Sequence, residues 1–241
     1  MRRGSTLISE MALLALAVVS AHGGPLPAGA AGAVPHLTTA QLWAIAAGAN
    51  LAYERGDGLD RLQFDCGASC AQAMLRRSWG VNGAADAEPV LVLLATVGHT
   101  AVLRQDLTAL ASVPPRQLEK WLSDQPPDRR QRLRFAYQHR LGFKNGWLLG
   151  WDLGRLINVA RAAYTAGWID ESTAWAHIMP AARRLQQSYS SWDELSQNYL
   201  LGRRYWAGGD QTQAKFDAAA EWLRFSPQSP WQRLAWSTPL Y

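Results

Sequence analysis

Apolar residues recur along most of the chain three and four positions apart, the spacing that places them on one face of an α-helix. The clearest case is NGWLLGWDLGRLINVARAAYTAGWID, residues 145–170, which is apolar on almost every side. We expect this helix to be capped by Asn145, to end at Gly167 and to be enclosed by the rest of the fold. It nevertheless carries Asp152 and Arg155 on one stripe, one turn apart. A buried carboxylate is costly unless it is paired, so these charges need an explanation.

Helical spacing and capping residues predict further helices on both sides of this segment. No stretch alternates polar and apolar residues as a strand does, so the predicted class is all-α, a single compact domain of about eight to nine helices. The expected helices cover residues 38–55, 65–79, 84–98, 115–122, 128–141, 145–167, 170 onward with a kink or break at Pro180, 191–208 and 210–225. Their expected caps are Thr38 with Gln41, Gly80, Asp128, Asn145, Asp170, Ser191 with Glu194, and Asp210. The residues expected on the inner face of helix 84–98 are Val90, Leu91, Leu94 and Val97.

The first residues of the chain are predicted to lie outside the fold, as a signal-like or flexible leader over residues 1–36. Arg2 and Arg3 precede an apolar run, Met11–Ala21, with small residues around a possible cleavage point after Ala21. This order is typical of a secretory signal peptide, and the run is too short for a comfortable membrane span. The alternative is a disordered leader, rich in Ala, Gly and Pro, that follows a misassigned start codon.

The remaining residues divide into a helical domain, residues 37–225, and an irregular tail, residues 226–241. We expect Trp231 and Trp236 of the tail to pack back on the domain. The prolines at 114–115 and 126–127 are the best candidates for seams within it.

Composition sharpens two parts of this picture. Nine of the 12 tryptophans lie between Trp147 and Trp236, which indicates a tightly specified core or a binding groove in the C-terminal half. The net charge of +5 comes from one segment, residues 129–144, which has five arginines, one lysine and no acidic residue. This basic patch consists of Arg129, Arg130, Arg132, Arg134, Arg140 and Lys144. It is either a solvated helix face, which we favour, or a footprint for nucleic acid or an anionic membrane.

The chain has two cysteines, Cys66 and Cys70, at a spacing that shares one helix face. In an oxidising compartment they form a local disulfide, and in the cytosol they are two small buried residues. A metal site would need further ligands, and the five histidines show no suitable spacing. No metal and no cofactor is therefore predicted.

Three stretches resemble the bacterial family called domain of unknown function 1266. They are LRRSWGVNGAADAEPVLVLLATVGHTAVL, WDLGRLINVARAAYTAGWIDESTAW and SYSSWDELSQNYLLGRRYW, and the resemblance covers about residues 40–225. It implies a helical protein without an established activity and, in most members, a cytoplasmic location. The chain would instead be exported if residues 1–21 are a genuine signal.

Asp152 and Arg155 are the first candidate binding residues. The favoured interpretation is a structural ion pair that reaches neighbouring helices through Asn158 or Arg161. The alternative is a site for an anionic or polar ligand, with Arg155 as the forked donor and Asp152 orienting it. His99, after Gly98, is expected to cap helix carbonyls more readily than to act as a base.

A second candidate set lies on one predicted helix. Tyr199, Arg203 and Trp206 share a face, and Trp192 lies on roughly the same side. They pack in the core or an interface, or they form an aromatic slot around one arginine for a planar or anionic ligand.

The sequence lacks the familiar motifs of hydrolases, zinc proteases, phosphate-binding loops and dinucleotide folds. The preferred function is therefore a non-enzymatic module that binds a protein partner, since Trp, Tyr and Arg are common interface anchors. The alternatives are an enzyme or small-ligand binder around Asp152, Arg155 and Arg203, and binding of nucleic acid or an anionic membrane through residues 129–144. The sequence gives neither the partner nor the oligomeric state.

Overall fold

The structure is a computed structural model, and it describes residues 36–143, 148–208 and 212–241. Within these ranges every regular element is a helix, which confirms the all-α class, although the helices outnumber the eight to nine expected. In chain order they are α2 (Thr39–Ala47), α3 (Ala49–Glu54), α4 (Gly67–Trp79), α5 (Ala84–Thr96), α6 (Gly98–Ala111), the 3₁₀ helix η1 (Pro115–Gln117), α7 (Leu118–Ser123), α8 (Pro127–His139), α9 (Leu149–Thr165), α10 (Glu171–Ser188), α11 (Trp192–Ala207), α12 (Gln213–Phe225) and α13 (Pro230–Arg233). Most of the predicted leader, the residues Lys144 and Asn145, and Asp210 lie outside the described residues.

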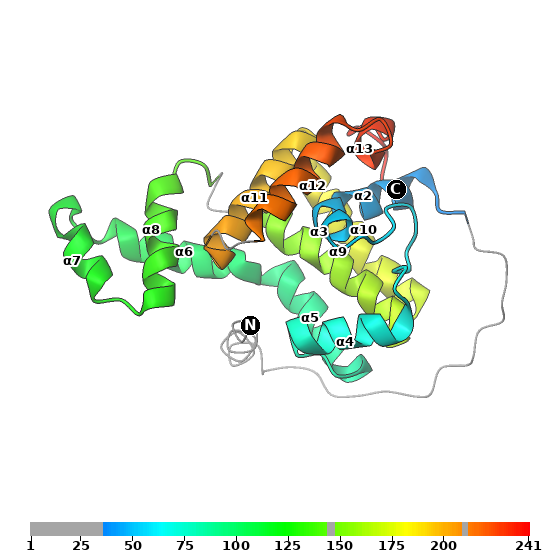
Figure 1. Cartoon of the computed structure of the whole chain (residues 1–241), viewed down its shortest axis with the longest axis horizontal. Helices are drawn as coiled ribbons and strands as arrows, with labels where there is room; N and C mark the ends of the chain where they lie inside the picture. The colour runs from blue at the N-terminus through cyan, green and yellow to red at the C-terminus, as the bar shows by residue number, and fades with distance from the viewer. Residues whose placement is uncertain (1–35, 144–147, 209–211) are drawn as a thin grey trace.

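Helix α9 is the centre of the fold, with α4, α5, α10 and α11 packed around it (Figure 1). All of its residues from Gly150 to Ala163 are buried, as the apolar sequence on every side predicts. The main hydrophobic cluster forms around this helix and includes Leu153, Leu156 and Ile157. An enclosed helix of this kind brings each of its polar side chains into contact with another element.

A second hydrophobic cluster lies beneath α6, α7 and α8, which extend away from the other helices in Figure 1. It contains Leu103 of α6, Leu122 of α7 and Leu133 of α8. Trp151 of α9 and Tyr199 of α11 belong to the same cluster. The extended part is therefore joined to the rest through the first turns of α9 and one face of α11.

The first predicted helix is divided at Gly48, because the chain there passes very close to α9. A β-carbon at position 48 would lie 2.8 Å from Nδ2 of Asn158 and 2.9 Å from Ile157. Asn158 donates a hydrogen bond to the Gly48 carbonyl at 2.8 Å. The predicted contact of Asn158 with a neighbouring element is thus present, and it falls where α2 gives way to α3.

The helix expected over residues 84–98 is α5, and a second helix, α6, follows it at a 45° bend. Val90, Leu91 and Leu94 are buried as predicted, but Val97 is 41% exposed because it stands at the bend. Helix α6 was not expected, since its own sequence offers no side-chain N-cap. Its first turn is capped by Asp152, a residue of α9 far away in the sequence.

Several helix ends agree with their predicted signals. Thr38 and Gln41 form a capping box, and the side chains of Asp170 and Ser191 accept hydrogen bonds from their own helix starts. The residues Gly80, Gly167 and Gly208 adopt positive φ where α4, α9 and α11 end. These ends are specified by residues within one turn of each other, which makes them readable from sequence.

Other predicted ends were wrong. Helix α8 begins at Pro127, whose fixed φ suits the first position, so Asp128 lies in the first turn and not at the cap. Helix α9 begins at Leu149 and α12 at Gln213, with Leu148 and Thr212 as N-cap residues; the predicted caps Asn145 and Asp210 lie outside the described residues. Helix α10 continues through Pro180 without a break.

The tail contains one short helix, α13, and otherwise runs over the domain without regular structure. Trp231 is buried and its indole N–H donates to the Ala46 carbonyl at 2.9 Å. Trp236 packs edge-on against Trp43 and Trp192. Both tryptophans pack back on the helical domain, as expected.

Candidate functional site

The carboxylate of Asp152 is buried and accepts four hydrogen bonds. Oδ1 accepts from Nη2 of Arg155 at 2.9 Å and from the His99 backbone N–H at 2.8 Å. Oδ2 accepts from the backbone N–H of Thr100 at 3.0 Å and from its hydroxyl at 2.9 Å. Four donors fill the lone-pair positions of a carboxylate, so Asp152 has none left for a ligand or a transferable proton. Burial raises the pKa of Asp152, but hydrogen bonding to His99 and the charge of Arg155 outweigh it, and the pKa is lowered.

The two backbone donors belong to the first turn of α6. Asp152 therefore supplies from α9 the anionic N-cap that α6 lacks. The exchange runs in both directions, because the Thr100 hydroxyl accepts a hydrogen bond from the Leu148 N–H at the start of α9 at 3.0 Å. The two helix starts satisfy each other's unpaired backbone groups.

Arg155 lies between the carboxylate and two aromatic rings. Its guanidinium carbon is 4.0 Å from the ring centre of Trp151 and 5.4 Å from that of Trp79. Its Nε donates to the Trp151 carbonyl at 3.1 Å. Arg155 is 6% exposed and Asp152 is 2% exposed, so the pair faces its neighbouring helices. This geometry favours the structural interpretation of the pair.

His99 was expected to cap carbonyls at a helix end. It lies instead in the first turn of α6, and its ring contacts Arg155. Nδ1 of its ring is 2.7 Å from Nη2 of Arg155. A guanidinium only donates, so Nδ1 accepts and the ring proton resides on Nε2. Burial and the charge of Arg155 lower the pKa of His99 to about 4, which keeps the ring neutral at physiological pH.

The second candidate set does not form one slot. Trp192 is 8% exposed and packs with Trp43, Trp231 and Trp236, far along α11 from Arg203. Tyr199 is 1% exposed and contacts Trp151 edge-on.

The other two residues of that set, Arg203 and Trp206, contact different neighbours. Arg203 is 4% exposed and stacks over Phe216 of α12, with its guanidinium carbon 4.3 Å from the ring centre; it also donates to the Thr212 hydroxyl. Trp206 is half-buried against His99, at 4.2 Å between ring centres. A binding role for Trp192, Tyr199, Arg203 and Trp206 stays a prediction, and their contacts are those of a packed core.

The basic patch is largely occupied by contacts within the chain. Arg130 donates to the carbonyls of Leu122, Ser123 and Gln125, where α7 ends. Arg134 pairs with Glu119 at 2.7 Å.

Two further arginines of the patch approach the buried carboxylate of Asp106. Their Nε atoms lie 3.6 Å (Arg129) and 3.8 Å (Arg132) from its oxygens, and Tyr205 donates to it at 2.8 Å. Arg140 folds over Tyr137. Three of these arginines thus lie near two carboxylates, whereas Arg130 and Arg140 contact carbonyls or a ring and keep their charge unbalanced within the described residues; a nucleic-acid or membrane footprint at this patch stays a prediction.

Arg161 was the other residue of α9 expected to reach a neighbouring element, and it contacts the loop between α3 and α4. Its guanidinium is fully buried and donates to the carbonyls of Gly58, Arg61 and Leu62 at 2.6, 3.0 and 3.2 Å. Burial lowers the pKa of Arg161 to about 10, so it stays charged at neutral pH. The loop between α3 and α4 is thereby fixed to the central helix.

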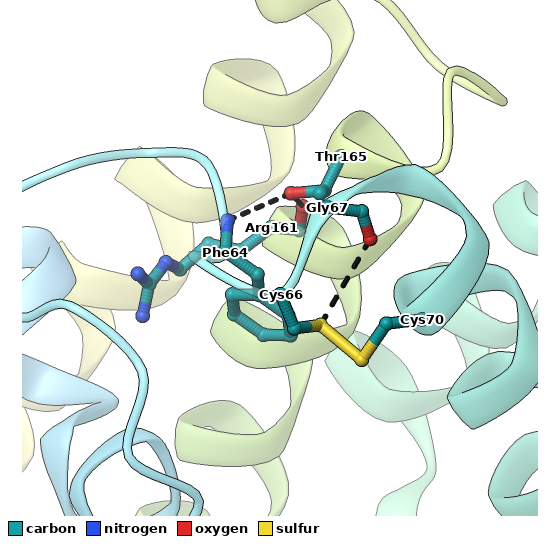
Figure 2. The surroundings of a disulfide bond; sticks show 6 residues. All are labelled: Phe64, Cys66, Gly67, Cys70, Arg161 and Thr165. Carbon is teal, nitrogen blue, oxygen red and sulfur yellow. Dashed lines mark hydrogen bonds between the residues drawn. A yellow bond between two sulfur atoms is a disulfide. The ribbon is translucent and has the colours of Figure 1, made fainter.

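That loop leads to a disulfide between Cys66 and Cys70 at the start of α4 (Figure 2). Both cysteines are exposed, so the alternative of two buried thiols was wrong. Phe64, two residues before Cys66, donates its backbone N–H to the hydroxyl of Thr165 at 2.9 Å.

An open groove of about 370 Å³ lies between α2, α12, α13 and the same loop. Its apolar wall consists of Leu42, Leu59, Trp222, Pro230 and Leu234, and its polar lining of Asp60, Gln228 and Arg233. The three polar residues are exposed, whereas the apolar ones are half-buried or buried. These residues come from distant positions and share no sequence pattern, so no motif indicated the groove.

Among the described residues, no group of three or more His, Cys, Asp or Glu side chains could hold a metal ion. No single described helix has the length and apolarity to cross a membrane, although the bent pair α5 and α6 passes that test jointly.

A family model described as protein of unknown function (DUF1266) matches residues 74–236. No curated protein and no solved structure matches the chain. The match includes Asp152, Arg155 and α11, and it begins after Cys66 and Cys70.

Proposed function

We propose that this chain, which belongs to the family described as protein of unknown function (DUF1266), is a non-enzymatic helical module that binds a protein partner. The observation that carries the proposal is the groove between α2, α12 and α13. An apolar wall with charged residues only at the exposed edge is the arrangement of a protein interface, with an apolar centre and a polar rim.

The groove also limits what can occupy it. A volume of about 370 Å³ accommodates a few side chains of a partner. Trp222, which stacks on Tyr53 at 4.4 Å between ring centres, offers a rigid apolar surface on one side. Asp60 and Arg233 provide one acidic and one basic contact at the rim. We therefore expect a partner segment that inserts apolar side chains and carries charges of both signs beside them.

The test is affinity capture from the native host with the intact chain and two matched variants. Leu59→Asp places a charge on the groove wall, whereas Phe225→Asp places one on an apolar residue of α12 that is 67% exposed and does not line the groove. The partner should be recovered with the parent chain and with Phe225→Asp, and lost with Leu59→Asp. Equal recovery with both variants would reject the groove as the interface.

A small-ligand function is the runner-up, because pockets of this volume also bind metabolites. A compound that raises the melting temperature of the parent chain, and not that of Leu59→Asp, would favour this alternative over a protein partner. We do not favour a ligand site at Asp152, Arg155 and Arg203, because the carboxylate is saturated by internal donors and the side chains are buried.

We also propose that the chain is exported and cleaved after Ala21. The signal-like order of residues 1–21 motivates this, and an exposed disulfide suits an oxidising compartment. Intact mass after expression in the native host should correspond to a chain that begins at His22. A full-length protein in the cytosolic fraction would contradict export.

A further inference from the structure

We propose that Cys66 and Cys70 form a reversible thiol–disulfide exchange site, and that this bond is not needed to hold the fold. The inference concerns a part of the chain that the family match does not cover, and it does not rest on the groove. The sequence contains no other cysteine, so any exchange must occur at this pair.

The first support is access. Both residues are exposed, and they lie at the N-terminal end of α4, which Figure 2 shows with the two sulfur atoms outside the ribbon of the helix. A thiol in solution can therefore approach the sulfur atoms without an opening of the core.

The second support is that other contacts hold both sides of the bond. Before it, Arg161 binds three loop carbonyls and Phe64 is tied to Thr165. After it, Gln72 donates to the Ala166 carbonyl at 3.0 Å, and the apolar side chain of Leu75 is fully buried. The disulfide closes a separation of only four residues, so it restricts the unfolded chain less than a long-range bond would.

The third support is the position of Cys66 at the N-cap of α4, a helix of 13 residues. A thiolate at this position lies at the positive end of the helix dipole, which stabilises it as a leaving group; in the disulfide form its Sγ makes no capping hydrogen bond and lies 3.9 Å from the Gly67 carbonyl oxygen. The site therefore favours attack on the other sulfur, that of Cys70.

The exchange proceeds with Cys70 as the attacked sulfur and Cys66 as the leaving group. One thiolate of a dithiol reductant attacks Sγ of Cys70, the Sγ–Sγ bond breaks, and its electron pair leaves on Cys66 as a thiolate. This leaves a mixed disulfide between the reductant and Cys70. The second thiol of the reductant loses its proton, attacks the reductant's own sulfur in that mixed disulfide and closes the reductant's disulfide. Cys70 leaves as a thiolate, and both cysteines take up protons according to pH. Two electrons pass from the reductant to the protein, and a low-molecular-weight disulfide reverses the reaction.

The test treats the folded full chain with millimolar dithiothreitol at neutral pH, counts free thiols and follows helicity by circular dichroism. Two thiols should appear while helicity is unchanged, and oxidised glutathione should remove them again. Thiols that appear only after denaturant is added, or helicity lost together with the bond, would overturn the proposal.

Single-cysteine variants test whether Cys66 is the leaving group and Cys70 the attacked sulfur. Cys66 in Cys70→Ser should react with iodoacetamide on the order of tenfold faster than Cys70 in Cys66→Ser, because the helix start stabilises its thiolate. Equal rates would reject the leaving-group role of Cys66. The double variant Cys66→Ser, Cys70→Ser should keep the helicity and nearly the melting temperature of the oxidised chain, and a large loss of either would identify the bond as a structural cross-link.

Discussion

The carboxylate of Asp152 lies against Gly98 in the space that a β-carbon at position 98 would occupy. The φ of Gly98 is +54°, and the next two backbone N–H groups point at the carboxylate oxygens. The glycine thus allows the approach through which α9 caps α6, and the requirement for it arises from a residue of another helix.

Gly98→Ala should therefore destabilise the fold more than an alanine at a glycine that only needs positive φ. Gly80→Ala is the matched control, because Gly80 has φ +66° and open space at its β-carbon position. The control should cost about 1–2 kcal/mol of unfolding free energy, and Gly98→Ala should cost more because Asp152 must also move. Denaturant unfolding of both variants measures the difference. Equal losses would mean that the close approach is of no consequence.

The ion pair should show strong coupling in a double-mutant cycle. Asp152→Asn leaves the buried Arg155 without a counter-charge, and Arg155→Met leaves Asp152 without its cation; each should cost roughly 3–5 kcal/mol. The double variant should lose less than the sum, since neither charge is then left unpaired. Additive losses in chemical denaturation would show that the two side chains act independently.

His99 should make stability fall in acid. The unfolded chain binds a proton at this residue near pH 6.5, whereas the folded chain does so only near pH 4, so protonation favours unfolding between these values. The loss is on the order of 3 kcal/mol. The lowered pKa of Asp152 acts in a lower window, because its contribution is complete above the usual carboxyl pKa of 3.8 and is lost below it.

The measurement is the unfolding free energy between pH 4 and 6.5 for the parent chain and for His99→Asn, whose amide oxygen can still accept from Arg155. The variant should lose most of the slope. His139→Asn, at an exposed position of α8, is the control and should retain it. A parent-like slope in His99→Asn would contradict the prediction.

Arg161→Lys should loosen the loop between α3 and α4. The guanidinium reaches the three carbonyls from two nitrogen atoms, Nε and Nη2, whereas lysine has a single donor nitrogen, so the buried Leu62 carbonyl or its part-buried neighbours lose a donor at about 1–3 kcal/mol each. We expect a lower melting temperature and faster tryptic cleavage after Arg61, whose side chain is 53% exposed. Arg183→Lys is the control, because Arg183 donates to the single carbonyl of Leu240. Cleavage at the parent rate in Arg161→Lys would show that other contacts hold the loop.

The features that could be predicted from the sequence are those whose partners lie close together along the chain. Thr38 with Gln41, Ser191 with Glu194, and the Asp152–Arg155 pair were all found because each partner lies within one helical turn of the other. Helix α6 was missed for the opposite reason, since its cap lies 53 residues away in sequence.

In the candidate site, too, contacts within one helix were predictable and contacts with distant segments were not. Tyr199 and Arg203 share a helix face as predicted and reach the same partner, Phe216, which no local pattern indicated. Trp192 belongs to a different cluster because the tail returns over it, and helical periodicity carries no information on such a return. The groove depends on four separate segments and was for that reason not predictable.

The reciprocal capping of α6 and α9 also bears on how this protein can be divided. The prolines at 114–115 and 126–127 look like places to cut, and α6, α7 and α8 extend from the rest as a detachable unit would (Figure 1). The anion that starts α6 nevertheless belongs to α9, and the hydroxyl that receives the first N–H of α9 belongs to α6. Neither piece carries its own helix start, so the extended helices cannot be transplanted into another protein as a cassette, and a graft would have to bring residues 148–155 with them.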